Sequence, residues 1–192
     1  MHLFVGLSGS LSPTHHEHFD DFWRSTTVRE FVSPQRMAKA LSGSEHLIFM
    51  VYASAGVPVA AAAARFDGSI KLLAMQHASD DDSFAAGRIL LRAVLHVLAV
   101  NNQVTGPVAT FPQRLVDRDA SLRQLLHAER MDSVDTPSER SSVYKGEFDD
   151  ATASYDCAIT EADKSLDRIR GCAVLSSSLC MSAAPPHPEP QS

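Results

Sequence analysis

The 192-residue sequence has few cysteines, and Cys157, Cys172 and Cys180 all lie in the last quarter of the chain. Their odd number and the lack of metal-ligand spacing argue against a disulfide framework and a zinc site, and favour reduced thiols. The opening stretch Met1–Leu7 also lacks the basic region that begins a signal peptide. We therefore expect a cytoplasmic protein.

Basic charge and long apolar runs are scarce as well. Lysine and arginine total 17 against 23 aspartates and glutamates, and no basic cluster offsets the formal net charge of −6, which argues against a nucleic-acid partner. The longest apolar run, at Val57–Ala64, is too short and too rich in alanine to span a bilayer, so no membrane partner is expected. The hydrophobic content of 44% instead predicts a globular protein.

Several motifs that mark enzymes are absent, among them Gly-x-Ser-x-Gly, the Walker loop, His-Glu-x-x-His and Cys-x-x-Cys. His15, His16 and His18 lie close to Asp20 and Asp21, but a third ligand at the proper spacing is missing. A solvated first helical turn is therefore favoured over a metal site, and no metal is expected.

The most informative stretch runs from Ser69 to Asn102. Ile70–His77 carries apolar residues on both faces, which predicts a strand that is covered on both sides. Asp80–Asp82 and Ser83 then offer N-caps for a helix over Phe84–Val100. In that helix the charged or imidazole side chains are spaced four apart and form one narrow stripe, which predicts that most of its surface is buried; they are Arg88, Arg92 and His96.

This stretch resembles the core of the GCN5-related N-acetyltransferase (GNAT) superfamily. The family's loop reads Arg or Gln, two residues, Gly, one residue, Gly or Ala, and then a basic residue with paired leucines. The same register here reads DSFAAG over residues 82–87, followed by RILL. Gly87 and the Arg88 continuation match the family, whereas Ala85 stands at the first glycine and Asp82 at the leading Arg or Gln.

The order of the expected elements also matches that family. Hairpin turns and apolar patterning predict two helices, three antiparallel strands, a long helix, a strand, a helix and a closing hairpin. The ranges are Thr14–Trp23 with Thr14 and Glu17 as a capping box, Pro34–Leu41, Leu47–Ala53, Val57–Phe66, Ile70–His77, Phe84–Val100, Gly106–Phe111, Pro112–Ala128, Met131–Val134 and Ser141–Phe148. The expected fold class is α/β (α+β), a GNAT-like mixed and mostly antiparallel central sheet flanked by helices. It covers residues 1–150, and residues 151–192 form a C-terminal extension with a short helix over Thr160–Arg170 and a disordered tail from Ser182.

The resemblance implies acetyl-CoA as co-substrate and an amine as acceptor. The residues that it implies for the cofactor are Met75, Gln76, His77, Phe84, Ala85, Ala86, Gly87 and Arg88. His77 is the candidate base, with Glu45 and His46 as alternatives, and the thioester carbonyl is expected at the backbone of Leu73–Gln76. The family's general acid is a tyrosine in the pattern Tyr-x-x-x-Gly-Phe, where this chain reads LHAERM over residues 126–131, so Tyr144 is the candidate substitute.

Two hypotheses follow. The first is an acetyl-CoA-dependent N-acetyltransferase that acts on a small-molecule or protein amine. The second is a catalytically inactive GNAT-like binding or regulatory module, which is favoured by Leu126 at the tyrosine position and by the acidic Asp80–Asp82. Those aspartates either cap the helix and complement its dipole, or border an anion site that their charge would weaken. The oligomeric state stays open, with a homodimer as one option.

Overall fold

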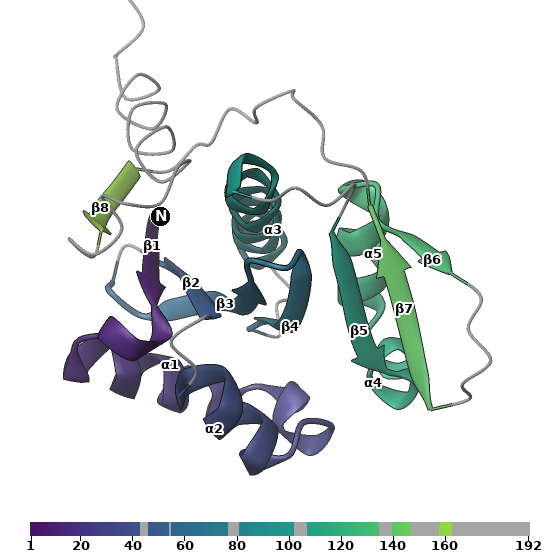
Figure 1. Cartoon of the computed structure of the whole chain (residues 1–192), viewed down its shortest axis with the longest axis horizontal. Helices are drawn as coiled ribbons and strands as arrows, with labels where there is room; N and C mark the ends of the chain where they lie inside the picture. Colours follow the sequence, from purple (N-terminus) through teal and green to yellow (C-terminus); the bar gives the residue numbers. More distant parts are fainter. Residues whose placement is uncertain are drawn as a thin grey trace, which may run out of the picture.

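A computed structural model describes residues 1–42, 46–53, 55–76, 81–101, 107–134, 140–146 and 158–162 of the chain. Within these ranges, eight strands form one mixed sheet in the order β6-β7-β5-β4-β3-β2-β1-β8, with helices on both faces (Figure 1). The pairs β4–β5 and β1–β8 are parallel, and the other neighbours are antiparallel. The expected mixed, mostly antiparallel sheet is thus confirmed.

The centre of the sheet is the expected meander of three strands. The strand bounds are β1 His2–Leu7, β2 His46–Tyr52, β3 Pro58–Arg65, β4 Ser69–Met75, β5 Val108–Pro112, β6 Asp132–Val134, β7 Ser141–Lys145 and β8 Ala158–Ala162. In β3 the run Ala60–Ala64 is fully buried. Such small side chains let helices approach the sheet closely from both sides, and both α1 (Pro13–Ser25) and α3 (Asp81–Asn101) contact β3.

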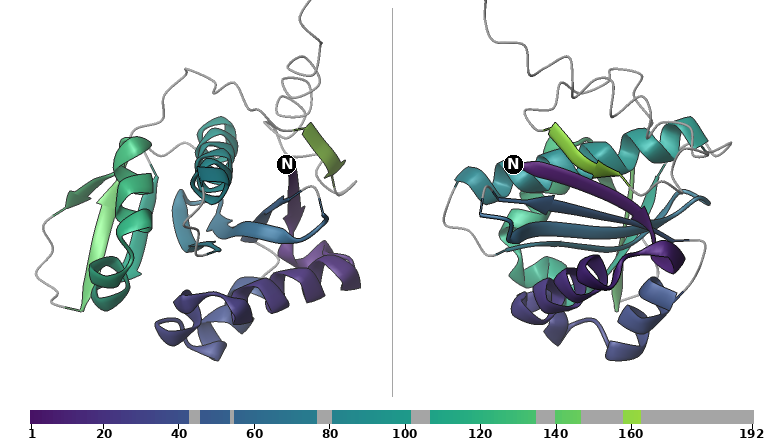
Figure 2. Two further views of the ribbon diagram at one scale, coloured as in Figure 1. Left: turned by 180° about the vertical axis from the view of Figure 1, so that it is seen from behind. Right: turned by 90° about the vertical axis from the view of Figure 1, so that its left-hand side faces the viewer.

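Helices cover the two faces in separate layers. Figure 2 shows α3 on one face of the central strands and α1 with α2 (Pro34–Ser42) on the other. The shorter helical segments are η1 Ser8–Ser10, η2 Thr27–Glu30, α4 Gln113–Arg118 and α5 Ala120–Ala128. Among the described residues, no helix is long and apolar enough to cross a membrane.

Two predicted helices differ from the structure at their ends. The first helix begins at Pro13, and its N-cap is Ser12, whose hydroxyl accepts a hydrogen bond from the His15 N–H, so the capping box at Thr14 is wrong. The helix predicted over Pro112–Ala128 is divided at Asp119. The Asp119 carboxylate accepts the Leu122 N–H at 2.9 Å and begins α5 anew, because a side-chain cap competes with continuation of the helix.

The C-terminal extension was predicted to form a helix over Thr160–Arg170, and this prediction is wrong at its start. Thr160–Ala162 belongs to β8, which pairs in parallel with β1 and covers an edge of the sheet that would otherwise expose backbone groups (Figure 2). Residues 163–192, including the tail predicted to be disordered, lie outside the described residues. The division of the chain at residue 150 stays a prediction.

Candidate active site

The two central strands β4 and β5 separate soon after they meet. Their ladder consists of two residue pairs, Ser69 with Val108 and Ile70 with Ala109, and beyond it the strands diverge (Figure 1). On its other side β4 stays paired with β3, and the Gln76 N–H donates to the Val59 carbonyl at 2.8 Å. Because hydrogen-bonding direction alternates along a strand, Leu73 and Met75 turn their backbone groups toward β5.

A guanidinium group bridges the strands where the ladder ends. Arg36, in α2, donates from Nη2 to the Lys71 carbonyl of β4 at 3.2 Å and to the Thr110 carbonyl of β5 at 3.3 Å. Side chains occupy most of the space beside it, and a pocket of about 10 Å³ is left. Sequence reasoning missed Arg36, because its role depends on a strand divergence that no local pattern encodes.

Gly87, expected at the cofactor loop, is a close-packing position. A Cβ atom built on it would lie 2.1 Å from the Met75 sulfur and 3.2 Å from Cδ2 of Leu125. The absence of a side chain therefore lets β4, α3 and α5 meet at this point. The structure thus brings together Met75 and Gly87, two of the residues expected at the cofactor.

The other residues expected at the cofactor line the first turns of α3 and the end of β4. Ala86 is buried, Phe84 is half-buried against the core, and Ala85 and Gln76 are exposed. The side chains of Asp81 and Asp82 and the whole of His77, Asp80 and Glu45 lie outside the described residues. The alternative base His46 is the half-buried first residue of β2.

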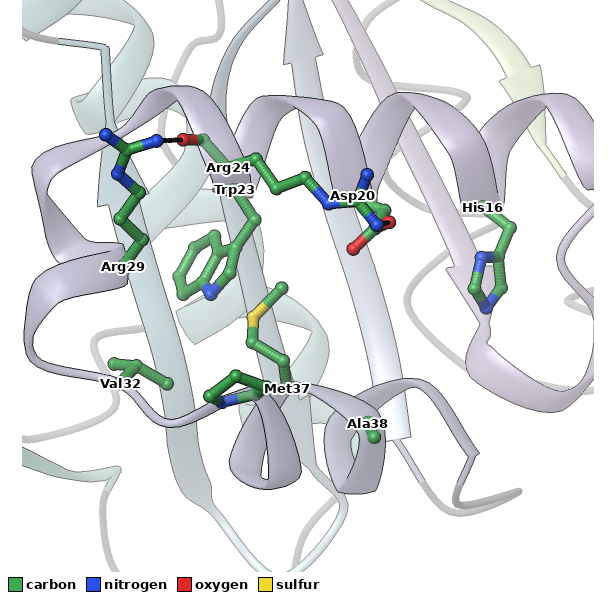
Figure 3. Close-up of a pocket in the computed structure, with 9 residues that line it drawn as sticks. His16, Asp20, Trp23, Arg24, Arg29, Val32, Met37 and Ala38 are labelled. Carbon is green, nitrogen blue, oxygen red and sulfur yellow. Dashed lines mark hydrogen bonds and ion pairs between the residues drawn. The ribbon is translucent and has the colours of Figure 1, made fainter.

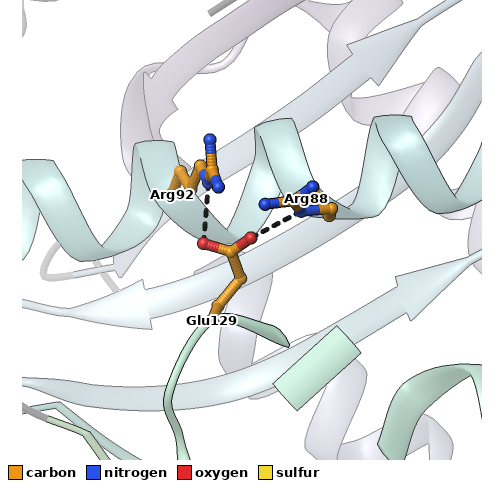
Figure 4. A network of polar contacts seen from close by, with 3 residues as sticks. All are labelled: Arg88, Arg92 and Glu129. Atoms are coloured by element: carbon orange, nitrogen blue, oxygen red, sulfur yellow. Dashed lines mark hydrogen bonds and ion pairs between the residues drawn. The ribbon is translucent and has the colours of Figure 1, made fainter. Parts of the chain in front are cut away.

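Arg88 pairs with an internal carboxylate. Its Nε donates to one oxygen of Glu129 at 2.7 Å, and the Arg92 Nε donates to the other oxygen at 2.7 Å (Figure 4). The Glu129 side chain is only 7% exposed, whereas those of Arg88 and Arg92 are 40% and 32% exposed. The stripe of arginines predicted on α3 therefore faces the end of α5. Sequence reasoning missed Glu129, although it lies within the segment compared with the family's tyrosine motif.

The same segment ends α5 in a Schellman motif. The Met131 N–H donates to the Leu126 carbonyl at 2.8 Å and the Arg130 N–H to the His127 carbonyl at 3.1 Å, while Leu126 and Met131 are buried together. Arg130 has a φ of 56°. It stands where the resemblance places glycine, so the backbone keeps the conformation that glycine favours without the glycine.

Tyr144, the candidate acid, lies on β7 with its ring edge against Phe111 of β5, the centroids 6.1 Å apart. Burial raises the pKa of its phenol, Arg123 lowers it, and Asp117 raises it further, and the net shift is upward from 10.0. Asp117 and Arg123 belong to α4 and α5, so Tyr144 lies near these helices. The phenol keeps its proton at neutral pH, as a proton donor must.

Two of the N-terminal histidines contact aromatic side chains. The His15 ring stacks on Phe4 with centroids 3.8 Å apart, and the His18 Nδ1 lies 3.3 Å from the Tyr52 hydroxyl. Among the residues that the structure describes, no group of three or more His, Cys, Asp or Glu side chains is placed to hold a metal ion.

The arrangement of strands and helices is similar to that of several solved structures, two of which are named as acetyltransferases. A GNAT-family acetyltransferase from Staphylococcus aureus Mu50 aligns with a TM-score of 0.57 and 9% identity, over 77% of this chain and 99% of that one. A putative phosphinothricin N-acetyltransferase aligns with a TM-score of 0.52 and 13% identity, over 77% and 99% of the two chains. TofI in an apo form aligns with a TM-score of 0.50 and 11% identity, over 79% of this chain and 94% of that one.

By sequence, no protein-family model and no curated protein matches the chain. The solved structures establish the fold: the chain has the GNAT fold, as its element order predicted.

Proposed function

We propose that this protein is an acetyl-CoA-dependent N-acetyltransferase that acts on a small-molecule or protein amine in the cytoplasm. The observation that carries the proposal is the divergence of β4 from β5 beyond Ile70. Beyond Ile70, the backbone groups of Leu73 and Met75 that point toward β5 therefore have no strand partner on that side. The pantetheine arm of acetyl-CoA contains amides that can hydrogen-bond to such groups as a strand would.

In the proposed reaction, the amine nitrogen attacks the thioester carbonyl carbon, a C–N bond forms, and the C–S bond breaks. A backbone N–H of Leu73 or Met75 would stabilise the charge that develops on the carbonyl oxygen. His77 is proposed to accept the proton of the ammonium group, and Tyr144 to protonate the leaving thiolate. Burial holds the pKa of the Tyr144 phenol above its usual value, which keeps this proton available.

A second candidate is a GNAT-like module that binds ligand or partner without acetyl transfer. Leu126 is fully buried at the family's tyrosine position and cannot donate a proton. In addition, Arg88 shares the single carboxylate of Glu129 with Arg92, so its charge is already partly offset within the protein.

The test is titration of acetyl-CoA into ¹⁵N-labelled protein, followed by calorimetry and by amide chemical shifts. We expect saturable heat, with larger shifts for the Leu73 and Met75 amides than for Ala74, which faces β3. The Ala74 amide is the internal control. Absence of both heat and shifts at millimolar acetyl-CoA would contradict every acetyl-CoA-dependent function.

Catalysis is then tested by release of free CoA thiol over a panel of amines. Tyr144→Phe should lower kcat about 100-fold or more, a usual loss for a general acid, while the Kd for acetyl-CoA stays unchanged. Tyr52→Phe, a second buried tyrosine on β2, is the matched control and should leave kcat unchanged. Binding without thiol release on any amine favours the non-catalytic module.

A further inference from the structure

A second candidate site lies between α1 and α2. This pocket has a volume of about 480 Å³, within the range of about 300–1,000 Å³ that small-molecule sites occupy (Figure 3). Its buried lining is apolar and comprises Trp23, Val32 and Met37. Its more exposed margin includes the charged residues Asp20, Arg24 and Arg29.

Trp23, one of the residues that line the pocket, carries a buried hydrogen-bond donor. Trp23 is only 2% exposed, and its Nε1 has no acceptor among the residues that the structure describes. Figure 3 shows the nitrogen edge of the indole turned toward the Met37 side of the pocket. Because buried N–H groups in folded proteins nearly always have a partner, this donor calls for an acceptor that the described residues do not supply.

The charges at the margin favour an anionic ligand. Arg24 forms an ion pair with Asp20, one helical turn earlier. Arg29 donates from Nη1 to the Arg24 carbonyl at 2.8 Å, which is a neutral partner. Among the described groups that line the pocket, the carboxylate of Asp20 is therefore already matched, and the positive charge of Arg29 is not offset.

We propose that this pocket binds a small monocarboxylate with an aromatic or branched aliphatic body. One carboxylate oxygen accepts the Trp23 Nε1–H, the charge is attracted by Arg29, and the body packs on Val32 and Met37.

This pocket lies beside the proposed acetyl-transfer site and shares Val32 with the small pocket next to Arg36. Pro34 and Ala38 line the pocket one helical turn apart, whereas Arg36, which bridges β4 and β5, lies about 200° around α2 from both. The carboxylate proposal therefore does not depend on acetyl-CoA, and either can fail alone.

The test uses the fact that Trp23 is the single tryptophan of the chain. Its indole N–H gives one assigned peak in a ¹H–¹⁵N spectrum of the whole protein. Phenylacetate and 4-methylpentanoate are the probes. We expect both to move this peak downfield with saturation, phenylacetamide to bind about tenfold more weakly, and 2-phenylethylamine to leave the peak in place.

Two variants locate the effect. Ala38→Phe fills the pocket from its exposed margin and should abolish the shift. Lys39→Phe, which introduces the same side chain at the next exposed position, should retain it. Arg29→Gln should weaken the binding of both carboxylates and leave the binding of phenylacetamide unchanged.

Three results would overturn the proposal. An indole peak that does not move with millimolar carboxylate would indicate that water alone serves the Trp23 N–H. An equal response to the amine would exclude a carboxylate site, and equal loss in both phenylalanine variants would place the binding elsewhere.

Discussion

Arg130 is a residue whose backbone and side chain have opposing preferences. Its φ of 56° lies in the left-handed region, where a β-carbon crowds the following carbonyl. The hydrogen bonds of Met131 and Arg130 to the last turn of α5, and the burial of Met131, hold this conformation in place. The strain therefore belongs to the helix end and not to the arginine side chain.

Replacing Arg130 separates the cost of its backbone conformation from the loss of its side chain. Arg130→Gly and Arg130→Ala remove the same side chain, but only glycine adopts a positive φ at little steric cost. We expect the glycine variant to be about 1 kcal/mol more stable than the alanine variant, measured by urea unfolding. Equal stabilities would mean that Arg130 is not strained.

Gly87 illustrates why one residue can be interpreted in two ways. A glycine at a helix start can let a phosphate approach, as the resemblance implies, or let another side chain approach, as Met75 does here. Because any side chain at this position must displace Met75, a large substitution such as Gly87→Glu disturbs packing before it disturbs a ligand. The shifts of the Leu73 and Met75 amides therefore test the cofactor site more cleanly than Gly87 variants do.

At the scale of elements, Glu129 joins α3 to α5. Two arginines from successive turns of α3 donate to the two oxygens of one carboxylate at the end of α5. Since the carboxylate is buried and both arginines are partly exposed, the carboxylate is the group that most needs its partners.

Glu129→Gln keeps the size of this side chain but presents an amide N–H₂ group to one of the arginine donors. We expect a loss of about 1–3 kcal/mol in the free energy of unfolding, less than for a fully buried pair because the arginines can turn to solvent. Glu30→Gln is the control, because its ion pair with Arg118 is long, at 3.8 Å, and exposed, and it should change little. Equal effects of the two variants, measured by urea unfolding, would contradict a stabilising role for the buried pair.

For the whole molecule, what could be predicted from sequence depended on the range of the interaction. The turn residues Asp67-Gly68 and the apolar run predicted as a strand over Leu47–Ala53 are local signals. The turn joins β3 to β4, and β2 spans His46–Tyr52, within one residue of the prediction at each end. The break at Asp119 was missed because the apolar pattern continues on both sides of this aspartate, which can either cap a new helix or stay within one. The pairing of β8 with β1 was missed because it joins residues more than 150 positions apart.

The residues of the candidate site also differ in whether their contacts are local or join distant elements. Met75 and Gly87 were expected together because they flank one strand–helix connection, and they do meet. Arg36 and Glu129 act across elements that only the folded sheet brings together, so their partners could not be inferred from spacing. Trp23 gave no signal in the sequence, since its role rests on the pocket around it.

The pH dependence of global stability follows from a histidine in the long helix. Burial lowers the pKa of His96 from 6.5, and its Nε2 is enclosed without a partner among the described residues. The unfolded chain therefore binds a proton at His96 more readily than the folded chain does. The stability that neutral His96 contributes is fully present above pH 6.5 and is lost as the pH falls through the lower pKa of the folded state.

We expect urea unfolding to give a lower free energy at about pH 5.5 than at about pH 7.5, and His96→Gln to reduce this difference. The same substitution at exposed His127 is the matched control and should retain the wild-type difference. If both variants kept the same dependence on pH, the proton taken up on unfolding would belong to another group, and His96 would not be buried in its neutral form.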